Sequence, residues 1–380
     1  MRSLKSSLLW SAVILLVITA SANADYQLFD LGTLGGTSSC AYSINNSGQI
    51  VGSASDSSGT KYACLFDSTG AKVNKNIAPI VSGSRQRGAA YSINNNGQIV
   101  GTDISSSGDN LAYLFDSTGG GGGTNLGTLP GFTNNEARAI NDNGWIVGDV
   151  STMPGTMGVA ARFSPSPNTN LGTLGGSHSN AYAINNNGKI VGGAADTSSS
   201  YYACIFDSTG GGANIGLGTL EGYNTSKANS INNLDDIVGW AFKGSPSSLS
   251  AVLFDSTGGG ENINLGALDY SYNQSQALSI NDLGQIVGSA FYSISSPDKI
   301  AVLFDPKGHG NNIDLNTLVT PPSGWWLSSA NCINNNGWIV GEMTNGSYTH
   351  AFLLTPEPAT ALLFTLGGVP VISGLRKRRS

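Results

Sequence analysis

One pattern of apolar and polar residues recurs seven times along the chain. Two apolar stretches flank a short polar segment, as in Ile44-Asn45-Asn46-Ser47-Gly48-Gln49-Ile50-Val51-Gly52. The central Asn-x-x-Gly is typical of a tight turn, because Asn bonds its own backbone and Gly accepts the left-handed conformation. Each copy therefore predicts a β-hairpin. The other copies begin at Ile93, Ile140, Ile184, Ile231, Ile280 and Ile333.

Two further apolar segments follow each hairpin and predict a third and a fourth strand. The third is Ala63-Cys64-Leu65-Phe66-Asp67, and the fourth is Leu-Gly-Thr-Leu or a near variant. In the fifth hairpin Asp235 replaces the turn Gly, which Asp tolerates at modest cost. An Ala also stands three residues before each hairpin Ile, as expected where neighbouring units approach closely. Copies of the third strand start at Ala112, Ala160, Ala203, Ala251, Ala301 and Ala351, and those of the fourth at Ile77, Leu126, Leu171, Leu217, Leu265 and Leu315.

The spacing of the hairpins, 44 to 53 residues, predicts the fold class. Four short antiparallel strands in that length are typical of one β-propeller blade, whereas solenoid coils are shorter. We therefore expect an all-β, seven-bladed propeller over residues 25–355. The last unit lacks a fourth strand, and residues 28–34 supply one, so the N-terminal strand is expected to close the ring and remove free sheet edges.

Both ends of the chain predict export. Residues 1–24 have the basic, apolar and small-residue regions of a signal peptide, and signal peptidase would cleave after Ala22-Asn23-Ala24. An uncleaved anchor is the alternative. Residues 356–380 combine Pro356-Glu357-Pro358, an apolar stretch over 359–375 that is just long enough to span a bilayer, and a basic end. The basic residues are Arg376, Lys377, Arg378 and Arg379.

This C-terminal segment resembles the PEP-CTERM sorting signal of Gram-negative bacteria. The resemblance implies processing by an exosortase-type enzyme, a transient membrane anchor, and a host that exports polysaccharide. The repeats resemble the HAF family of extracellular repeats, whose His-Ala-Phe occurs here as His350-Ala351-Phe352. That resemblance implies a secreted protein at the cell surface and brings no catalytic residues.

Charge narrows the choice of partners. Only 11% of residues are charged, and the chain carries a net charge of −6. Loss of residues 1–24 and 356–380 removes six of 18 basic and one of 24 acidic residues, which leaves about −11. Such a body lacks the positive footprint that nucleic acids and anionic lipids require.

The sequence contains no catalytic motif, and we expect neither a cofactor nor a metal. His178, His309 and His350 lack metal-ligand spacing. Asn141-Asp142-Asn143-Gly144 lacks the further carboxylates of a calcium loop, so a plain hairpin turn is favoured. The cysteines are expected to be small buried residues, with a bridge between Cys40 and Cys332 as the alternative. The remaining two are Cys64 and Cys204.

Candidate binding residues are those that break the repeat. The connections from a fourth strand to the next hairpin would lie on one face of a propeller, and several carry aromatic rings beside amide side chains. Such rings stack on sugars, while amides bond to hydroxyl groups. Alternatively, each ring packs on the end of its own blade. Trp145 and Trp338, just after the turn Gly, are weaker candidates, because a Trp at a strand edge more often covers core. The candidates are Phe132, Tyr223, Tyr270, Tyr272, Trp325 and Trp326.

We therefore expect a non-catalytic protein that binds extracellular polysaccharide. A polysaccharide lyase or glycosidase is the first alternative, although the sequence pairs no two carboxylates at the separation that this chemistry needs. A purely structural surface component is the second. The possible catalytic carboxylates are Glu136, Asp149, Glu221, Asp269 and Glu342.

Overall fold

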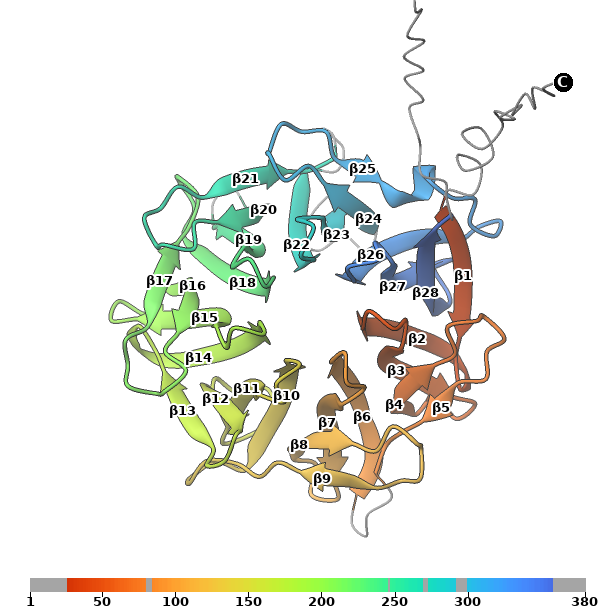
Figure 1. Ribbon diagram of the computed structural model, residues 1–380, viewed down its shortest axis with the longest axis horizontal. Coiled ribbons are helices and arrows are strands. Elements are labelled where there is room, and N and C mark those ends of the chain that lie inside the picture. Colours follow the sequence, from red (N-terminus) through yellow and green to blue (C-terminus); the bar gives the residue numbers. More distant parts are fainter. Residues whose placement is uncertain (1–25, 80–83, 245–246, 269–272, 292–298, 358–380) are drawn as a thin grey trace, which may run out of the picture.

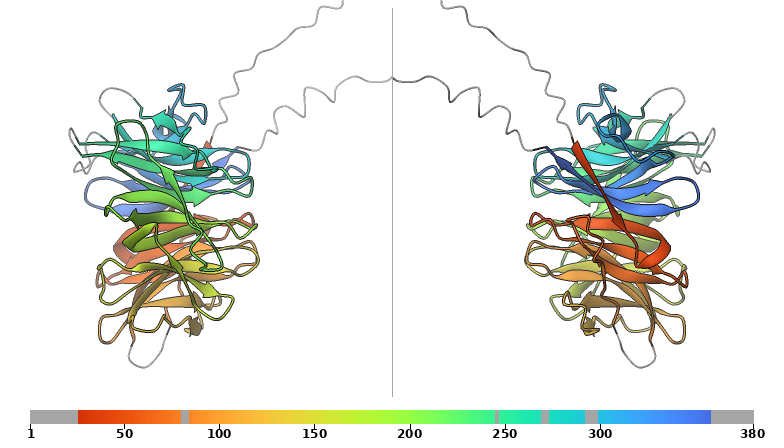
Figure 2. Two further views of the ribbon diagram at one scale, coloured as in Figure 1. Left: turned by 90° about the vertical axis from the view of Figure 1, so that its left-hand side faces the viewer. Right: turned by 90° about the vertical axis from the view of Figure 1, so that its right-hand side faces the viewer.

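The computed structural model describes residues 26–79, 84–244, 247–268, 273–291 and 299–357. Their regular structure is almost entirely β-strand, with one short 3-10 turn, η1 (Leu315–Thr317). The strands form antiparallel, mostly four-stranded sheets, which confirms the all-β prediction. The sheets radiate from a common centre in a propeller-like arrangement (Figure 1), and in side views their strands cross the thickness of a flattened body (Figure 2).

Five sheets contain four consecutive strands each. They are β6 (Ser84–Ile93), β7 (Ile99–Ser105), β8 (Asn110–Phe115) and β9 (Gly123–Asn125); β10 (Asn134–Ile140), β11 (Ile146–Ser151), β12 (Val159–Ser164) and β13 (Thr169–Gly172); β14 (Gly175–Ile184), β15 (Ile190–Asp196), β16 (Tyr201–Phe206) and β17 (Ile215–Gly218); β18 (Thr225–Ile231), β19 (Ile237–Lys243), β20 (Ser248–Phe254) and β21 (Ile263–Gly266); β22 (Gln274–Ile280), β23 (Ile286–Phe291), β24 (Lys299–Phe304) and β25 (Ile313–Asp314).

The two ends of the described chain meet in an eight-stranded sheet. Antiparallel pairing of β1 with β28 runs from Tyr26 opposite Pro356 to Gly32 opposite Ala351. The sheet has two halves, and a single parallel bridge between Ser38 and Thr349 links them. One half holds β26 (Trp326–Ile333), β27 (Ile339–Thr344), β28 (Thr349–Pro356) and β1 (Tyr26–Gly32), and the other holds β2 (Gly35–Ile44), β3 (Ile50–Asp56), β4 (Lys61–Phe66) and β5 (Lys75–Asn76).

The repeated Asn-x-x-Gly segments form the turns between the first two strands of each unit, as predicted. The turn Gly has positive φ, for example +80° at Gly48, and Asp235 adopts +70° in its place. Opposite the Ala that precedes each turn lies the Gly of Ile-Val-Gly, and a Cβ at Gly52 would stand 1.9 Å from the Cys40 carbonyl oxygen. The seven alanines are fully buried, which explains their small size: Ala41, Ala90, Ala137, Ala181, Ala228, Ala277 and Ala330.

The first Asn of each turn bonds to the next turn. In Asn94, Oδ1 accepts the amides of Asn96 and Gln98 at 3.1 and 2.9 Å, while Nδ2 donates to the Asn141 carbonyl oxygen at 2.9 Å. The same Nδ2 bond recurs from turn to turn and returns to the start, where Asn334 donates to the Asn45 carbonyl oxygen at 3.0 Å. The donors are Asn45, Asn94, Asn141, Asn185, Asn232, Asn281 and Asn334.

A second circle of hydrogen bonds passes through the next position of each turn. Here the backbone amide donates to the side-chain Oδ1 of the following unit, as from Asn95 to Asp142 at 2.8 Å and from Asn335 to Asn46 at 3.0 Å. This position needs only an acceptor, so Asp serves as well as Asn. Its residues are Asn46, Asn95, Asp142, Asn186, Asn233, Asp282 and Asn335.

The fourth strands begin and end earlier in the sequence than predicted. In β13, β17 and β21 the strand ends at the Gly of Leu-Gly-Thr-Leu, where φ is positive, as at Gly172 (+75°). In the first unit β5 (Lys75–Asn76) ends before residues 77–79, and the rest of that predicted strand lies outside the described residues. The left-handed Gly turns the chain away from its partner strand, and the pairing stops there.

The apolar core lies between adjacent sheets. One cluster joins Ile44 and Phe66 of the first unit to Val340 and Leu353 of the last. Another joins Val51 of the first unit to Ile99 of the second. Since each sheet buries its faces only against its neighbours, stability depends on the units being held side by side.

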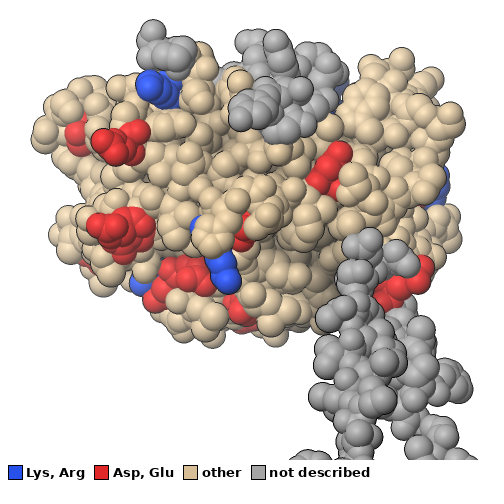
Figure 3. Space-filling view, turned by 90° about the horizontal axis from the view of Figure 1, so that it is seen from above, with Lys and Arg blue, Asp and Glu red and all other residues tan. Residues whose placement is uncertain are grey.

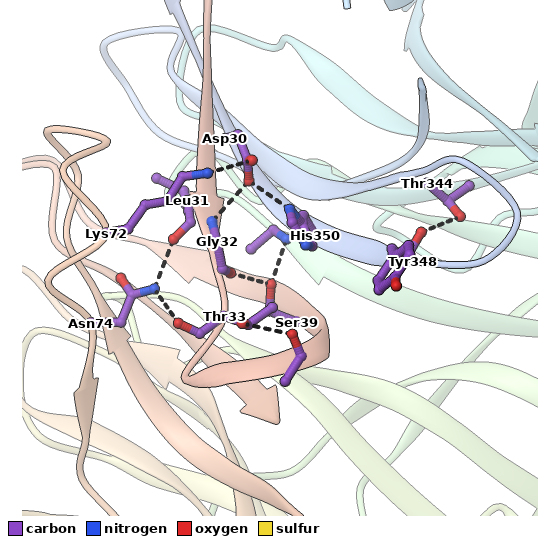
Figure 4. Close-up of polar contacts among 12 residues, drawn as sticks. Asp30, Leu31, Gly32, Thr33, Ser39, Lys72, Asn74, Thr344, Tyr348 and His350 are labelled. Carbon is purple, nitrogen blue, oxygen red and sulfur yellow. Dashed lines mark hydrogen bonds and ion pairs between the residues drawn. The ribbon is translucent and has the colours of Figure 1, made fainter. Parts of the chain in front are cut away.

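The junction of the chain ends has its own polar contacts (Figure 4). Asp30 on β1 accepts hydrogen bonds from Lys72 Nζ at 2.7 Å and the Gly32 amide at 2.9 Å, and its carboxylate lies 3.0 Å from His350 Nδ1. Ser39 Oγ donates to the Gly32 carbonyl oxygen at 2.5 Å and accepts the Ala351 amide at 2.8 Å. These contacts hold β1 between the last unit and the first.

Substitution in the first circle tests whether the Asn donor is needed. Asn94→Asp keeps Oδ1 as an acceptor but removes the bond to the Asn141 carbonyl oxygen and places a carboxylate against it. We expect a loss of about 1–3 kcal/mol in the free energy of unfolding, measured in urea. Asn46→Asp, in the second circle, keeps the Oδ1 that accepts the Asn335 amide, and Asn46 Nδ2 makes no hydrogen bond within the described residues. It is the matched control, with an expected change below about 1 kcal/mol. Equal effects of the two substitutions would contradict this role.

A second test uses the pH dependence of the junction. Burial alone would raise the pKa of Asp30, but hydrogen bonds from His350, Lys72 and Gly32 outweigh it and hold that pKa well below its usual range. A lowered carboxyl pKa stabilises the fold above the unfolded value near 4, and this contribution is lost as pH falls through the folded value. Asp30→Asn should therefore cost about 1 kcal/mol at pH 7, with a difference from the wild type that shrinks in acid. A difference independent of pH would exclude the mechanism.

Candidate functional site

The strand ends divide the molecule into two faces. The turn face carries the Asn-x-x-Gly turns. The loop face carries the opposite ends: the turns between second and third strands, such as residues 56–60, and the connections that lead into the next unit. The predicted aromatic residues belong to these connections, so the described ones lie toward the loop face.

Trp325 and Trp326 line a pocket of about 320 Å³ together with Lys299, Asp314 and Asn316. The Trp325 ring lies 4.7 Å from the His350 ring and packs on the core of the last unit. Trp326 Nε1 donates to the Lys299 carbonyl oxygen at 3.2 Å. Both tryptophans keep part of their surface exposed, and Lys299 is exposed without an ion-pair partner among the described residues.

The other described rings, Phe132 and Tyr223, do not line this pocket. Phe132 packs on the core cluster that joins the second and third units. Tyr223 packs on the cluster that joins the fourth and fifth units, and its hydroxyl group lies 2.7 Å from Ser250 Oγ. Tyr270 and Tyr272 lie outside the described residues. Among the described aromatic candidates, the structure therefore brings together only the two tryptophans.

Two of the amide side chains near these rings, those of Asn134 and Asn135, are occupied by the fold. Asn134 Oδ1 accepts the Asn110 amide at 2.8 Å, and Asn135 Nδ2 donates to the Gly127 carbonyl oxygen at 2.8 Å. Both side chains are buried. Asn224 Oδ1 accepts the Gly244 amide at 3.0 Å. Asn134 and Asn135 therefore join neighbouring strands and are not free to bond a sugar, whereas Asn224 is exposed and uses only its Oδ1 within the described residues.

A group of residues that sequence reasoning missed lies on the innermost strands. We call it the inner belt: Tyr42, Tyr91, Arg138, Tyr182 and Lys227. The Tyr42 and Tyr91 rings lie 5.6 Å apart, across the first and second units. Lys227 Nζ lies 4.1 Å from the centre of the Tyr182 ring, and Arg138 Cζ lies 5.1 Å from it. Tyr42, Tyr91, Arg138 and Tyr182 directly follow the repeated Ala, at a position that varies from copy to copy, and this variation is the missed signal. Lys227 instead directly precedes its Ala.

Only 11% of the residues are charged, and the outer edge shows small groups of charged residues on an otherwise uncharged surface (Figure 3). The inner belt, by contrast, includes two cationic side chains, Arg138 and Lys227. Arg138 bonds to Glu136 at 2.7 Å and to Asp149 at 2.5 Å. Burial, with repulsion from Arg138, lowers the pKa of Lys227 to about 8. Burial also raises the pKa of Tyr91 to about 12.

Glu136 and Asp149 are two of the carboxylates considered for a glycosidase. They are cross-strand partners, so the fold does bring them together. Arg138 bonds to both, so each carboxylate is already paired with the guanidinium group. Glu221 is exposed elsewhere, and Asp269 lies outside the described residues.

The structure shows how the other candidate ligands are used. The Asp142 carboxylate accepts hydrogen bonds from Asn95 and Asn186 in the second circle, as in a plain turn. Within the described ranges, no group of three His, Cys, Asp or Glu side chains is placed to hold a metal ion. His178 stacks on Tyr201. All four cysteines are free; Cys40, Cys64 and Cys204 are buried and Cys332 is partly buried.

Trp145 and Trp338, which follow the turn Gly in their units, pack on core clusters. A Cβ added to the turn Gly of a neighbouring unit would meet these rings, 2.6 Å from Trp338 at Gly48 and 3.4 Å from Trp145 at Gly188. Trp145 also lies 5.3 Å from Arg162 Cζ. These two rings cover core clusters, as expected of a Trp at a strand edge.

No protein family matches the sequence, and no curated protein is similar to it. TolB from Acinetobacter baumannii shares 14% identity at a TM-score of 0.40, over 86% of this chain and 65% of that one. Trypanosoma rangeli sialidase in complex with sialic acid shares 12% identity at a TM-score of 0.39, over 90% of this chain and 58% of that one. The chain thus spans less than two thirds of either structure, and likenesses of this size carry no argument about function.

Lys227 offers a test of the inner belt. Because its folded-state pKa of about 8 lies below the ordinary 10.5, the unfolded chain binds more protons between these values. Stability should therefore rise with pH over that window, by an amount of the order of 2 kcal/mol. Lys227→Met should abolish the rise, whereas Met at the exposed Lys75 should not. Urea unfolding between pH 7.5 and 10.5 measures it, and an unchanged rise in Lys227→Met would exclude burial of this amine.

Proposed function

We propose that this chain is a secreted seven-bladed β-propeller that binds extracellular polysaccharide without cleaving it. It would act at the surface of a Gram-negative cell or in the surrounding matrix. Two hydrogen-bond circles that pass through seven turns support the number of blades. Pairing of β1 with β28 supports closure of the last blade by the N-terminal strand.

Export and sorting rest on the sequence, since residues 1–25 and 358–380 lie outside the described part. Tyr26 pairs with Pro356, so the ends left by signal peptidase and by an exosortase-type enzyme would emerge from neighbouring strands. A cut after Pro358 would leave every described strand intact. None of the described segments is a helix long and apolar enough to cross a bilayer, so membrane attachment would depend on residues 359–375 before processing.

The pocket at Trp325 and Trp326 carries the proposal of sugar binding. It offers two partly exposed indole rings for the C–H face of a sugar, with the Lys299 ammonium group and the Asp314 carboxylate on its wall. Carbohydrate sites combine such flat apolar surfaces with a few polar groups. Its volume of about 320 Å³ is that of a small-molecule site.

Co-sedimentation tests this function. The full-length chain, purified in mild detergent, is mixed with the exopolysaccharide of its own host over a range of concentrations. We expect saturable binding that weakens about tenfold in Trp326→Ala, because the ring lost is the more peripheral of the two and the core contact of Trp325 is kept. Reducing ends are assayed in the same samples.

Leu283→Ala is the matched control, because Leu283 is 69% exposed on the turn face. Loss of binding in this control as well would contradict the pocket assignment. No binding by the wild type would leave the structural surface component as the better hypothesis. New reducing ends would favour a polysaccharide-cleaving enzyme instead.

A further inference from the structure

A second pocket, of about 460 Å³, opens between the first and second units on the loop face. Its walls include the turn that follows β3, the start of β4, and the strands β6 and β7. It contains none of the candidate residues predicted from sequence and does not share a residue with the tryptophan pocket.

The charge of this pocket is opposite to that of the protein. Its only two charged lining residues, Lys61 and Arg87, are both basic and exposed. Neither has an ion-pair partner in the described part of the chain, where Lys72, Arg138 and Lys189 do have one. A body with an excess of acidic residues therefore presents here two uncompensated cations, which favour a small anionic ligand.

The remaining walls suit a hydroxylated ring. Tyr42 and Tyr91 contribute two partly exposed rings, 5.6 Å apart and tilted by 52°. The Thr102 side chain is only 4% exposed, and its hydroxyl group has no hydrogen-bond partner within the described residues. A buried hydroxyl group is rarely left unpaired, so a ligand group at this wall would satisfy it. Asn110 adds an amide side chain.

We propose that this pocket binds an acidic sugar residue of the polysaccharide, with its carboxylate on Arg87 and Lys61. The guanidinium fork of Arg87 matches a carboxylate with two parallel hydrogen bonds, and Lys61 adds a second positive charge. The sugar ring contacts Tyr42 and Tyr91, and ring hydroxyl groups reach Thr102 and Asn110. This inference rests on the proposed function and adds the class of sugar to it.

Calorimetric titration of the full-length chain tests this assignment, with tetragalacturonate as the acidic probe and cellotetraose as the neutral one. Tetragalacturonate should bind, and more weakly as salt is raised, because surface charges are screened. Cellotetraose should bind at least tenfold more weakly. Arg87→Gln and Lys61→Gln should each weaken tetragalacturonate binding by about tenfold. Lys75→Gln removes an exposed charge from the same unit outside the pocket and should leave binding unchanged.

Two results would overturn the inference. One is equal affinity for the two probes. The other is binding of tetragalacturonate that survives in the double variant Lys61→Gln/Arg87→Gln. Sulfated neocarratetraose separates the kinds of acidic group: weaker binding than tetragalacturonate supports a carboxylated sugar, and tighter binding overturns that choice.

The two proposals fail separately. Trp326→Ala should weaken co-sedimentation with the exopolysaccharide and leave tetragalacturonate binding unchanged. If the wild type sediments with the exopolysaccharide but does not bind tetragalacturonate, the acidic-sugar inference is wrong and the proposed function stands. If tetragalacturonate binds but the exopolysaccharide does not, the pocket assignment stands and the proposed function is wrong.

Discussion

The hydrogen bonds made by the first Asn of each turn constrain the whole molecule. Each side chain accepts two amides of its own turn through Oδ1 and donates to the next unit through Nδ2, as Asn94 does. One residue thus shapes its turn and sets the distance to its neighbour. Asp lacks the donor, and Ser is too short to do both, so the position is Asn in all seven copies. The next position needs only an acceptor, and there Asp142 and Asp282 occur beside five Asn residues.

Packing depends on this spacing because no sheet has a core of its own. Clusters such as the one containing Ile44 and Val340 form only when adjacent units are in contact. On the outer rim a second Asn also links neighbouring units. Asn74 Nδ2 donates to the carbonyl oxygens of Leu31 and Thr33 at 2.7 and 3.1 Å. The same two bonds recur at Asn168, Asn214, Asn262 and Asn312. Polar side chains at the inner turns and the outer loops therefore hold apolar faces together between them.

The sequence predicted the all-β class, the hairpins and the third strands, because turn chemistry and apolar runs are local signals. It misplaced the end of the fourth strand, since Leu-Gly-Thr-Leu does not reveal that Gly172 takes a positive φ. The hydrogen bonds of the second Asn, on the outer rim, were also missed, because their acceptors lie about 40 residues away in the sequence. For the site, only the pairing of Trp325 with Trp326 followed from sequence. The sequence did not show which amide side chains were free to bind a ligand, because Asn134 and Asn135 bond to other parts of the fold.

The inner belt shows where a repeat protein of this kind has room to vary. After each fully buried Ala the pairing with the second strand shifts by one residue, as between Ala41 and Ser43. The extra residue, Tyr42 in that copy, takes no part in the regular register, so its identity is not fixed by the strand pairing. Across the copies it is Tyr, Tyr, Arg, Tyr, Asn, Leu and Asn. The residues that repeat in every copy build the ring. The bulge lets each unit present a different side chain from its innermost strand, so we expect functional differences between units at this position.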